Sequence, residues 1–98
     1  MVESEKLLER KLGRKVRAAG GISIKLLSTH ITGLPDRMCL LPGGRVFFAE
    51  IKTTGKKPTK IQKAIHSKFM KLGFNVYVID RSSQIDDICR KEIYTDTN

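Results

Sequence analysis

The chain has 98 residues, a mass of 11.1 kDa and 40% hydrophobic residues, which is the length and apolar content of one folded domain. Its 19 Lys and Arg residues outnumber its 10 Asp and Glu residues, and the net charge of +9 favours a polyanionic partner, nucleic acid before membrane. Two cysteines are too few for a disulfide scaffold, and no apolar run is long enough to span a membrane. We therefore expect a single domain over residues 1–98 with reduced thiols.

The N-terminal segment, MVESEKLLERK, lacks the apolar stretch of a signal peptide, so a cytoplasmic, intracellular protein is expected. A domain of this size buries only about 60–65% of the surface that its unfolded chain exposes. A partner subunit would therefore add to its stability.

The N-terminal half predicts one helix and three strands. Helical spacing of apolar residues favours a helix over 3–19, which a glycine pair ends. A strand follows over 22–28. Strands over 37–41 and 45–52 form a hairpin, because Pro42-Gly43-Gly44 between them is a turn sequence. Both faces of this hairpin are apolar, which is typical of strands covered on both sides.

The C-terminal half continues with a helix, a strand and a helix. They are expected over 58–72, over 74–80, and from a cap at Ser82 or Ser83 to about Ile93, with a frayed tail over 94–98. The last strand follows a helix, so we expect it to lie parallel to the strand before that helix. The fold class is therefore α/β, with a mixed sheet covered by helices in the order α-β-β-β-α-β-α.

Acidic residues are scarce in the middle of the chain. Residues 10–79 contain 15 basic residues and two acids, Asp36 and Glu50. Two lone carboxylates in such a basic region indicate that the protein needs them. Ordinary acids at strand ends are the alternative interpretation.

The predicted hairpin brings these carboxylates together. A three-residue turn pairs Leu41 with Arg45, which places Asp36 across from Glu50 on one face, with Lys52 farther along that face. Facing carboxylates repel each other unless a cation neutralises them, and carboxylates hold Mg²⁺ in proteins. Lys52 would position or deprotonate a water molecule and offset the charge of a developing phosphorane. This set indicates phosphodiester cleavage, and a surface Glu50–Lys52 pair with Asp36 capping a turn is the alternative.

The sequences GLPDR at 33–37 and EIK at 50–52, followed by Gln62, resemble the VRR-NUC family of the PD-(D/E)xK nuclease superfamily, especially its small stand-alone phage-type members. The resemblance extends from about residue 5 to residue 90. It implies a restriction-endonuclease-like α-β-β-β-α-β core, here with a C-terminal helix, and Mg²⁺ or Mn²⁺ as cofactor. It also implies metal ligation by Asp36, Glu50 and the Ile51 carbonyl, water activation by Lys52, and a Gln62 side chain directed at the site.

The family also carries a glutamate in its first helix as a metal ligand. Glu9 fits this role best in the present sequence, because it lies on the inward face of the predicted helix, and Glu5 is the competing choice. A solvated Glu9 in a salt-bridging helix is the alternative. Arg37 would point to the opposite face of the sheet from Asp36 and anchor helix packing or a dimer contact.

Basic residues near the motif are candidate DNA contacts, because phosphate contacts give affinity without sequence specificity. The candidates are Lys56, Lys57, Lys60, Lys63, His30 and Arg14. The alternative for the lysines is a solvated helix face. Arg14 belongs to a second basic cluster, which would line the other side of a groove or contact a second duplex arm. His66, four residues after Gln62, is expected to be half-exposed, and contact with the scissile phosphate is its alternative.

The resemblance implies a divalent-metal-dependent, structure-specific DNA endonuclease. Small family members resemble homodimeric Holliday junction resolvases, so the expected partners are branched DNA, in particular a four-way junction, and a second copy of the chain in a phage-infected cell. One alternative is a monomeric flap or nicking nuclease, or part of a restriction system. The other is a non-catalytic basic module that binds DNA or RNA, against which the intact Asp36, Glu50 and Lys52 argue.

Overall fold

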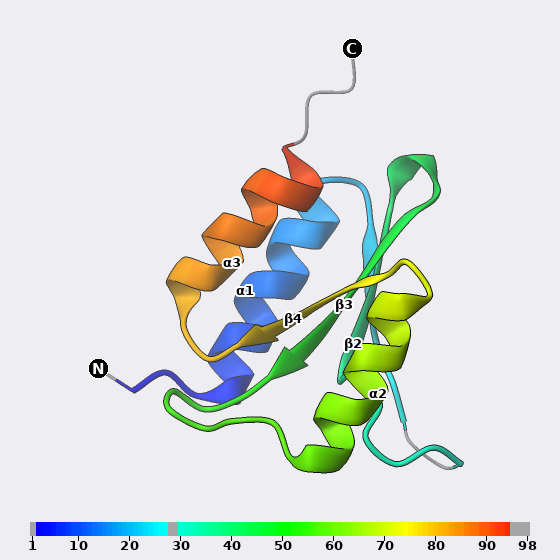
Figure 1. The fold of residues 1–98 in the computed structure, drawn as a ribbon. Coiled ribbons are helices and arrows are strands. Elements are labelled where there is room, and N and C mark those ends of the chain that lie inside the picture. Colours follow the sequence, from blue (N-terminus) through cyan, green and yellow to red (C-terminus); the bar gives the residue numbers. More distant parts are fainter. Residues whose placement is uncertain (1, 28–29, 95–98) are drawn as a thin grey trace.

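The computed structural model describes residues 2–27 and 30–94, whose helices and strands follow the predicted order (Figure 1). The elements are α1 (Glu5–Ala18), β1 (Ile22–Lys25), β2 (Arg37–Leu41), β3 (Arg45–Ile51), α2 (Lys60–Lys71), β4 (Asn75–Ile79) and α3 (Ser82–Ile88). A short 3₁₀ turn, Pro42–Gly44, joins β2 to β3, and one π-helical turn, Cys89–Ile93, continues α3. The predicted frayed tail lies mostly outside the described residues.

All three predicted helix starts lie one or two residues from the observed ones, and the contacts at the caps explain the last two. The hydroxyl of Thr59 accepts from the Gln62 N–H at 3.2 Å, and Gln62 Oε1 accepts from the Thr59 N–H at 2.9 Å, so this capping box starts α2 after Pro58. Neither predicted serine caps α3, which has Arg81 at that position. The Ser82 N–H and hydroxyl instead donate to the Glu3 carboxylate.

The sheet has the strand order β1-β2-β3-β4. The β1–β2 and β2–β3 pairs are antiparallel, whereas β4 lies parallel to β3, as predicted for a strand that follows a crossover helix. Leu41 pairs with Arg45 and Arg37 with Ala49, which confirms the predicted hairpin register. The turn is feasible because Gly43 has a φ of 82°, a left-handed conformation that glycine adopts without strain.

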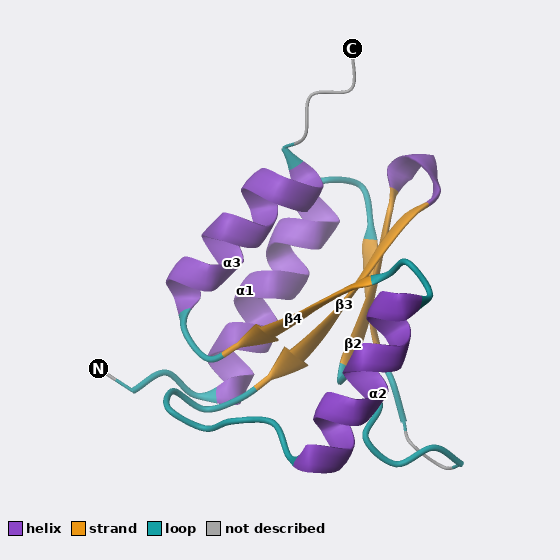
Figure 2. Cartoon of the chain, viewed as in Figure 1, coloured by secondary structure: helices purple, strands orange, loops and turns teal. Residues whose placement is uncertain are grey.

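Helices cover both faces of the sheet (Figure 2), with α1 and α3 on one face and α2 on the other. Side chains from β2, β3 and β4 meet α1 and α3 in the main core, whose largest buried members include Leu8, Leu12, Phe47, Ile51, Ile79 and Ile85. Because side chains alternate between the two faces along β3, its other side chains point toward α2. This mixed α/β arrangement confirms the predicted fold class.

The face under α2 is less apolar than the main core. Phe48 packs edge-on against Phe69 at 4.8 Å and against Phe74 at 5.7 Å between ring centroids. Beyond this aromatic cluster, the buried side chains on the same face are polar, namely Glu50 of β3 and His66 of α2. No helix in the described ranges is long and apolar enough to cross a membrane.

Candidate active site

The predicted motif residues converge where β3 ends beneath the first turns of α2. Glu50 and Lys52 share the α2-facing side of β3 and its extension, because side chains alternate along a strand. Gln62 and His66 lie one helical turn apart on α2 and both approach Glu50. The end of β3 and the start of α2, which one loop separates, thereby build one cluster.

The loop before β2 brings Asp36 to this cluster by packing tightly against α2. Gly33 has a φ of 93°, and a Cβ there would lie 2.9 Å from the Ile61 carbonyl oxygen, so any side chain would push the loop away. Asp36 Oδ2 accepts a hydrogen bond of 2.8 Å from the Ile51 N–H, which ties the end of the loop to β3. The carboxylate of Asp36 thus lies beside that of Glu50, close enough to raise its pKa.

Glu50 is the central group of the site. Its side chain is buried, with a residue exposure of 1%, and its Oε2 accepts from Gln62 Nε2 at 3.1 Å and lies 3.3 Å from Lys52 Nζ. Burial and then the neighbouring Asp36 charge raise the pKa of Glu50 to about 7, although Lys52 acts in the opposite direction. Glu50 is therefore a carboxylate in a place where ionisation is costly.

The other oxygen, Glu50 Oε1, faces His66. Glu50 Oε1 and His66 Nε2 are 3.6 Å apart, and each lacks a hydrogen-bond partner within the described residues. His66 is 4% exposed, so the expectation of a half-exposed histidine is wrong. Burial lowers the pKa of His66, as does Lys52, whereas Asp36 opposes the shift. The four-residue spacing from Gln62 was the signal that could have located this histidine in the site.

The chemistry of these groups fits a divalent cation. Asp36 and Glu50 are adjacent carboxylates, and burial leaves Glu50 Oε1 without a proton donor. A cation at this position would remove their repulsion and coordinate that oxygen. Ile51 contributes its main chain to the same place through its hydrogen bond to Asp36. Its carbonyl as a ligand remains a prediction.

Glu9 is not brought to this pair of carboxylates. Its Oε2 lies 2.8 Å from Arg37 Nη2, on the α1 face of the sheet, because Arg37 projects to the opposite side of β2 from the Asp36 site. The described residues hold no group of three or more His, Cys, Asp or Glu side chains arranged around one metal position. Arg37 therefore anchors α1 through Glu9, and a metal role for Glu9 would need α1 to move. Glu5, the competing choice, is exposed.

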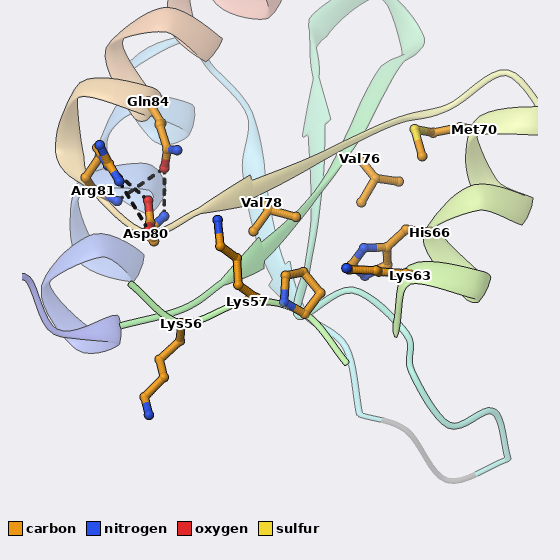
Figure 3. A pocket seen from close by; sticks show the side chains of 11 residues that line it. Lys56, Lys57, Lys63, His66, Met70, Val76, Val78, Asp80, Arg81 and Gln84 are labelled. Carbon is orange, nitrogen blue, oxygen red and sulfur yellow. Dashed lines mark hydrogen bonds and ion pairs between the residues drawn. The ribbon is translucent and has the colours of Figure 1, made fainter. Parts of the chain in front are cut away.

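A groove of about 430 Å³ opens beside the cluster, between α2, β4 and the start of α3 (Figure 3). Val76 and Val78 form its apolar floor, and His66 lies at the end nearest Glu50. Figure 3 shows Lys57 over the floor, while the side chain of Lys56 extends away from the other labelled residues. Asp36, Glu50, Lys52 and Gln62 do not line this groove, and His66 is the residue of the cluster that it reaches.

The predicted DNA contacts divide between two surfaces. Lys56, Lys57 and Lys63 line the groove, together with Arg81, whereas Lys60 is exposed at the first residue of α2. His30 is exposed in the loop that precedes β2.

Arg14 lies on the opposite side of the molecule, in a hollow of about 410 Å³. This second hollow is lined by Glu9, Arg10, Gly13, Arg14, Arg17, Ser23 and Arg37. The second basic cluster therefore does not line the other side of this groove. Contact with a second duplex arm is the position that stays a prediction.

Comparisons with known proteins give the family. No family model matches the chain. Over 76 residues it is 41% identical to "Putative nuclease p44" of Acyrthosiphon pisum secondary endosymbiont phage 1, an alignment that covers 78% of this chain and 82% of that protein. A solved structure described as a VRR_NUC domain matches with a TM-score of 0.83 and 29% sequence identity, covering 90% of this chain and 97% of the other. The chain therefore belongs to the VRR-NUC family of PD-(D/E)xK nucleases.

Proposed function

We propose that this protein is a divalent-metal-dependent endonuclease that acts as a homodimer on branched DNA, with the four-way Holliday junction as its substrate. The observation that carries the proposal is the buried Glu50, which shares its site with Asp36, Lys52 and Gln62 beside a cationic groove. The similarity to a phage protein with a nuclease name supports phosphodiester hydrolysis and action in the cytoplasm of a phage-infected cell.

Each motif residue has a role that its contacts support. Asp36, Glu50 and the Ile51 carbonyl would hold Mg²⁺ or Mn²⁺, which supplies an acidified water molecule and charge stabilisation when bound. Lys52 Nζ, 3.3 Å from Glu50 Oε2, would orient the attacking water and offset the negative charge that grows on the phosphoryl oxygens. Gln62 keeps Glu50 Oε2 in place through its amide, so that Oε1 remains directed at the site.

DNA binding would use both cationic surfaces. Lys57 and Lys63 in the groove, with Lys56 and Lys60 nearby, would contact the phosphates of the strand that is cut. His30, in the loop that leads to Asp36, would enter the adjacent groove of the DNA. Arg14 and its neighbours on α1 face another direction and would contact a second arm of a junction. Such a division of charge suits a branched substrate better than a single linear duplex.

A two-fold dimer would present two such sites to opposed strands of a junction. Light scattering coupled to size-exclusion chromatography would give the mass of the free protein and of its junction complex. A complex containing one copy of the chain would contradict the dimer.

The central test is cleavage of end-labelled four-way junction, 5′ flap and linear duplex of matched sequence, with Mg²⁺ or Mn²⁺. We expect paired, symmetric nicks in the junction, and a loss of rate of roughly 10²- to 10⁴-fold in Lys52→Ala, the range for removal of a proton-transfer group. Lys6→Ala removes an exposed charge from α1 outside both hollows and serves as the matched control.

Other outcomes would identify the alternative functions. Cutting of the flap alone would keep the nuclease and exclude the resolvase. Tight, salt-sensitive binding without cleavage by either metal would favour the non-catalytic module. Calorimetry with the metal alone separates these cases further, because the module predicts no site that Asp36→Ala could remove.

A further inference from the structure

Two buried polar atoms in the site have no hydrogen-bond partner within the described residues. They are Glu50 Oε1 and His66 Nε2, and they face each other across 3.6 Å. An unsatisfied buried polar group costs about 1–3 kcal/mol, so such a facing pair requires an explanation. Hydrogen bonds to bulk water do not explain it, because Glu50 and His66 are only 1% and 4% exposed.

The separation of these atoms is too long for a hydrogen bond but suits a shared ligand. A first-row divalent metal takes nitrogen and oxygen donors at about 2.0–2.2 Å. Two such donors at neighbouring positions of one metal lie about 3.0–3.5 Å apart, by simple geometry from those bond lengths. The gap between Glu50 Oε1 and His66 Nε2 is close to this range.

The surroundings hold both atoms in position for such a role. Glu50 Oε2 is occupied by Gln62 and Lys52, so Oε1 is the oxygen that remains available. The helix that carries His66 is fixed by the Gln62 contact and by the packing of Phe69 against Phe48. Burial favours the neutral imidazole that a metal ligand requires.

We propose that His66 Nε2 ligates the same cation as Glu50 Oε1, so that the site prefers Mn²⁺ or a similar imidazole-binding ion over Mg²⁺. Imidazole nitrogen suits first-row transition ions, whereas Mg²⁺ selects oxygen ligands and keeps its waters. This inference rests on the proposed function in one respect, namely that Asp36 and Glu50 hold a metal. It adds a nitrogen ligand from α2 to the oxygen ligands that the motif predicts. Because no three His, Cys, Asp or Glu side chains surround one metal position in the described residues, Asp36 would move toward the ion as it binds.

The test uses the full chain without DNA and reads the metal directly. Mn²⁺ is added to wild-type protein, and pulsed electron paramagnetic resonance reports nitrogen coupled to the metal. We expect modulation from a histidine nitrogen that changes when histidine is labelled with ¹⁵N. It should be lost in His66→Ala and His66→Gln and kept in His30→Ala, a variant of the exposed histidine.

Calorimetric titrations supply a second readout. Loss of the nitrogen ligand should weaken Mn²⁺ binding by at least about tenfold, the lower end of what even indirect partners of a metal contribute. Mg²⁺ binding should change much less. The Kd for Mg²⁺ divided by the Kd for Mn²⁺ should therefore fall. Circular dichroism of each variant establishes that it is folded, and His66→Gln retains a hydrogen-bonding side chain if the alanine variant does not fold.

The outcomes separate this inference from the proposed function. One outcome is that Mn²⁺ binds the wild-type protein but not Asp36→Asn, and that no coupling to a histidine nitrogen is seen. This result would overturn the role of His66 and leave the proposed nuclease function intact. If neither metal binds the wild-type protein, both ideas fail. Nitrogen coupling together with inactivity toward every DNA substrate would keep the ligand and contradict the nuclease.

Discussion

The two carboxylate oxygens of Glu50 have different partners, and this difference determines which of them is available to a ligand. Oε2 is held by Gln62 and Lys52, whereas Oε1 is buried opposite His66. A carboxylate of this kind is costly without a cation, and burial together with Asp36 raises its pKa to about 7. The same arrangement fixes the direction in which the free oxygen points, which preorganises it for a ligand.

Gln62 serves the helix and the site at once, and substitutions can separate the two roles. Gln62→Glu keeps an oxygen that accepts from the Thr59 N–H but loses the amide that donates to Glu50. We expect cleavage to fall about 10- to 100-fold, as for other groups that orient a metal ligand. Stability should also fall, because the new carboxylate oxygen faces Glu50 Oε2 where the amide of Gln62 donated.

Thr59→Ala is the complementary variant. It removes the hydroxyl that caps α2 and should lower the free energy of unfolding by about 1 kcal/mol while the folded protein remains active. Denaturant titration and initial cleavage rates measure the two effects. Equal losses of stability and activity in both variants would mean that Gln62 acts only through the helix.

At the scale of elements, the segment before α1 is tied to the segment between β4 and α3. Glu3 accepts from the Ser82 N–H and hydroxyl, and its own N–H donates to Thr54 Oγ1 at 2.8 Å. Thr54 Oγ1 in turn donates to the Asp80 carbonyl at 2.7 Å. These contacts close the end of the fold at which the basic loop between β3 and α2 leaves the sheet.

This connection predicts a pH effect. The two Ser82 hydrogen bonds lower the pKa of Glu3 below its usual 4.5. A lowered folded-state pKa contributes stability that is present above about pH 4.5 and is lost as the pH falls through the folded value. Glu3→Gln should therefore unfold at lower denaturant concentration than wild type at pH 7, and the two should converge in acid. A constant difference down to pH 2 would contradict this, and Glu5→Gln, at an exposed site, is the control.

At the scale of the whole molecule, two hollows among the described residues are lined by basic side chains, and they lie on opposite faces of the sheet. The groove with Lys57 adjoins the candidate active site, and the hollow with Arg14 lies along α1. The net charge of +9 alone would not reveal this separation. A protein that cuts a junction has a use for both surfaces, because the arms of a junction diverge.

The two surfaces should respond differently to substitution. Lys57→Ala should weaken binding to both linear duplex and four-way junction, and lower the slope of log affinity against log salt by about 0.9, one phosphate contact. Arg14→Ala should do so only with the junction. Fluorescence anisotropy over a salt series measures both, with Lys6→Ala as the control. An equal effect of Arg14→Ala on both DNAs would contradict contact with a second arm.

Local sequence patterns were sufficient to predict the order of the elements and the register of the hairpin. The order of helices and strands follows from apolar periodicity and from glycine and proline positions. The hairpin register follows from the three-residue turn, and with it the approach of Asp36 to Glu50, because strand side chains alternate strictly. These features depend on neighbours in the chain or across one turn, so the sequence by itself was sufficient to predict them.

Packing between distant segments decided the rest. The pairing of Glu9 with Arg37, the burial of His66 and the groove over β4 all depend on how α1 and α2 lie on the two faces of the sheet. Helical spacing gives the direction of a side chain around its own axis but not the angle or depth at which the helix docks. The tertiary structure alone therefore showed that the first-helix glutamate is held away from the carboxylates. It also showed that His66, which helical spacing only aligns with Gln62, is buried beside them.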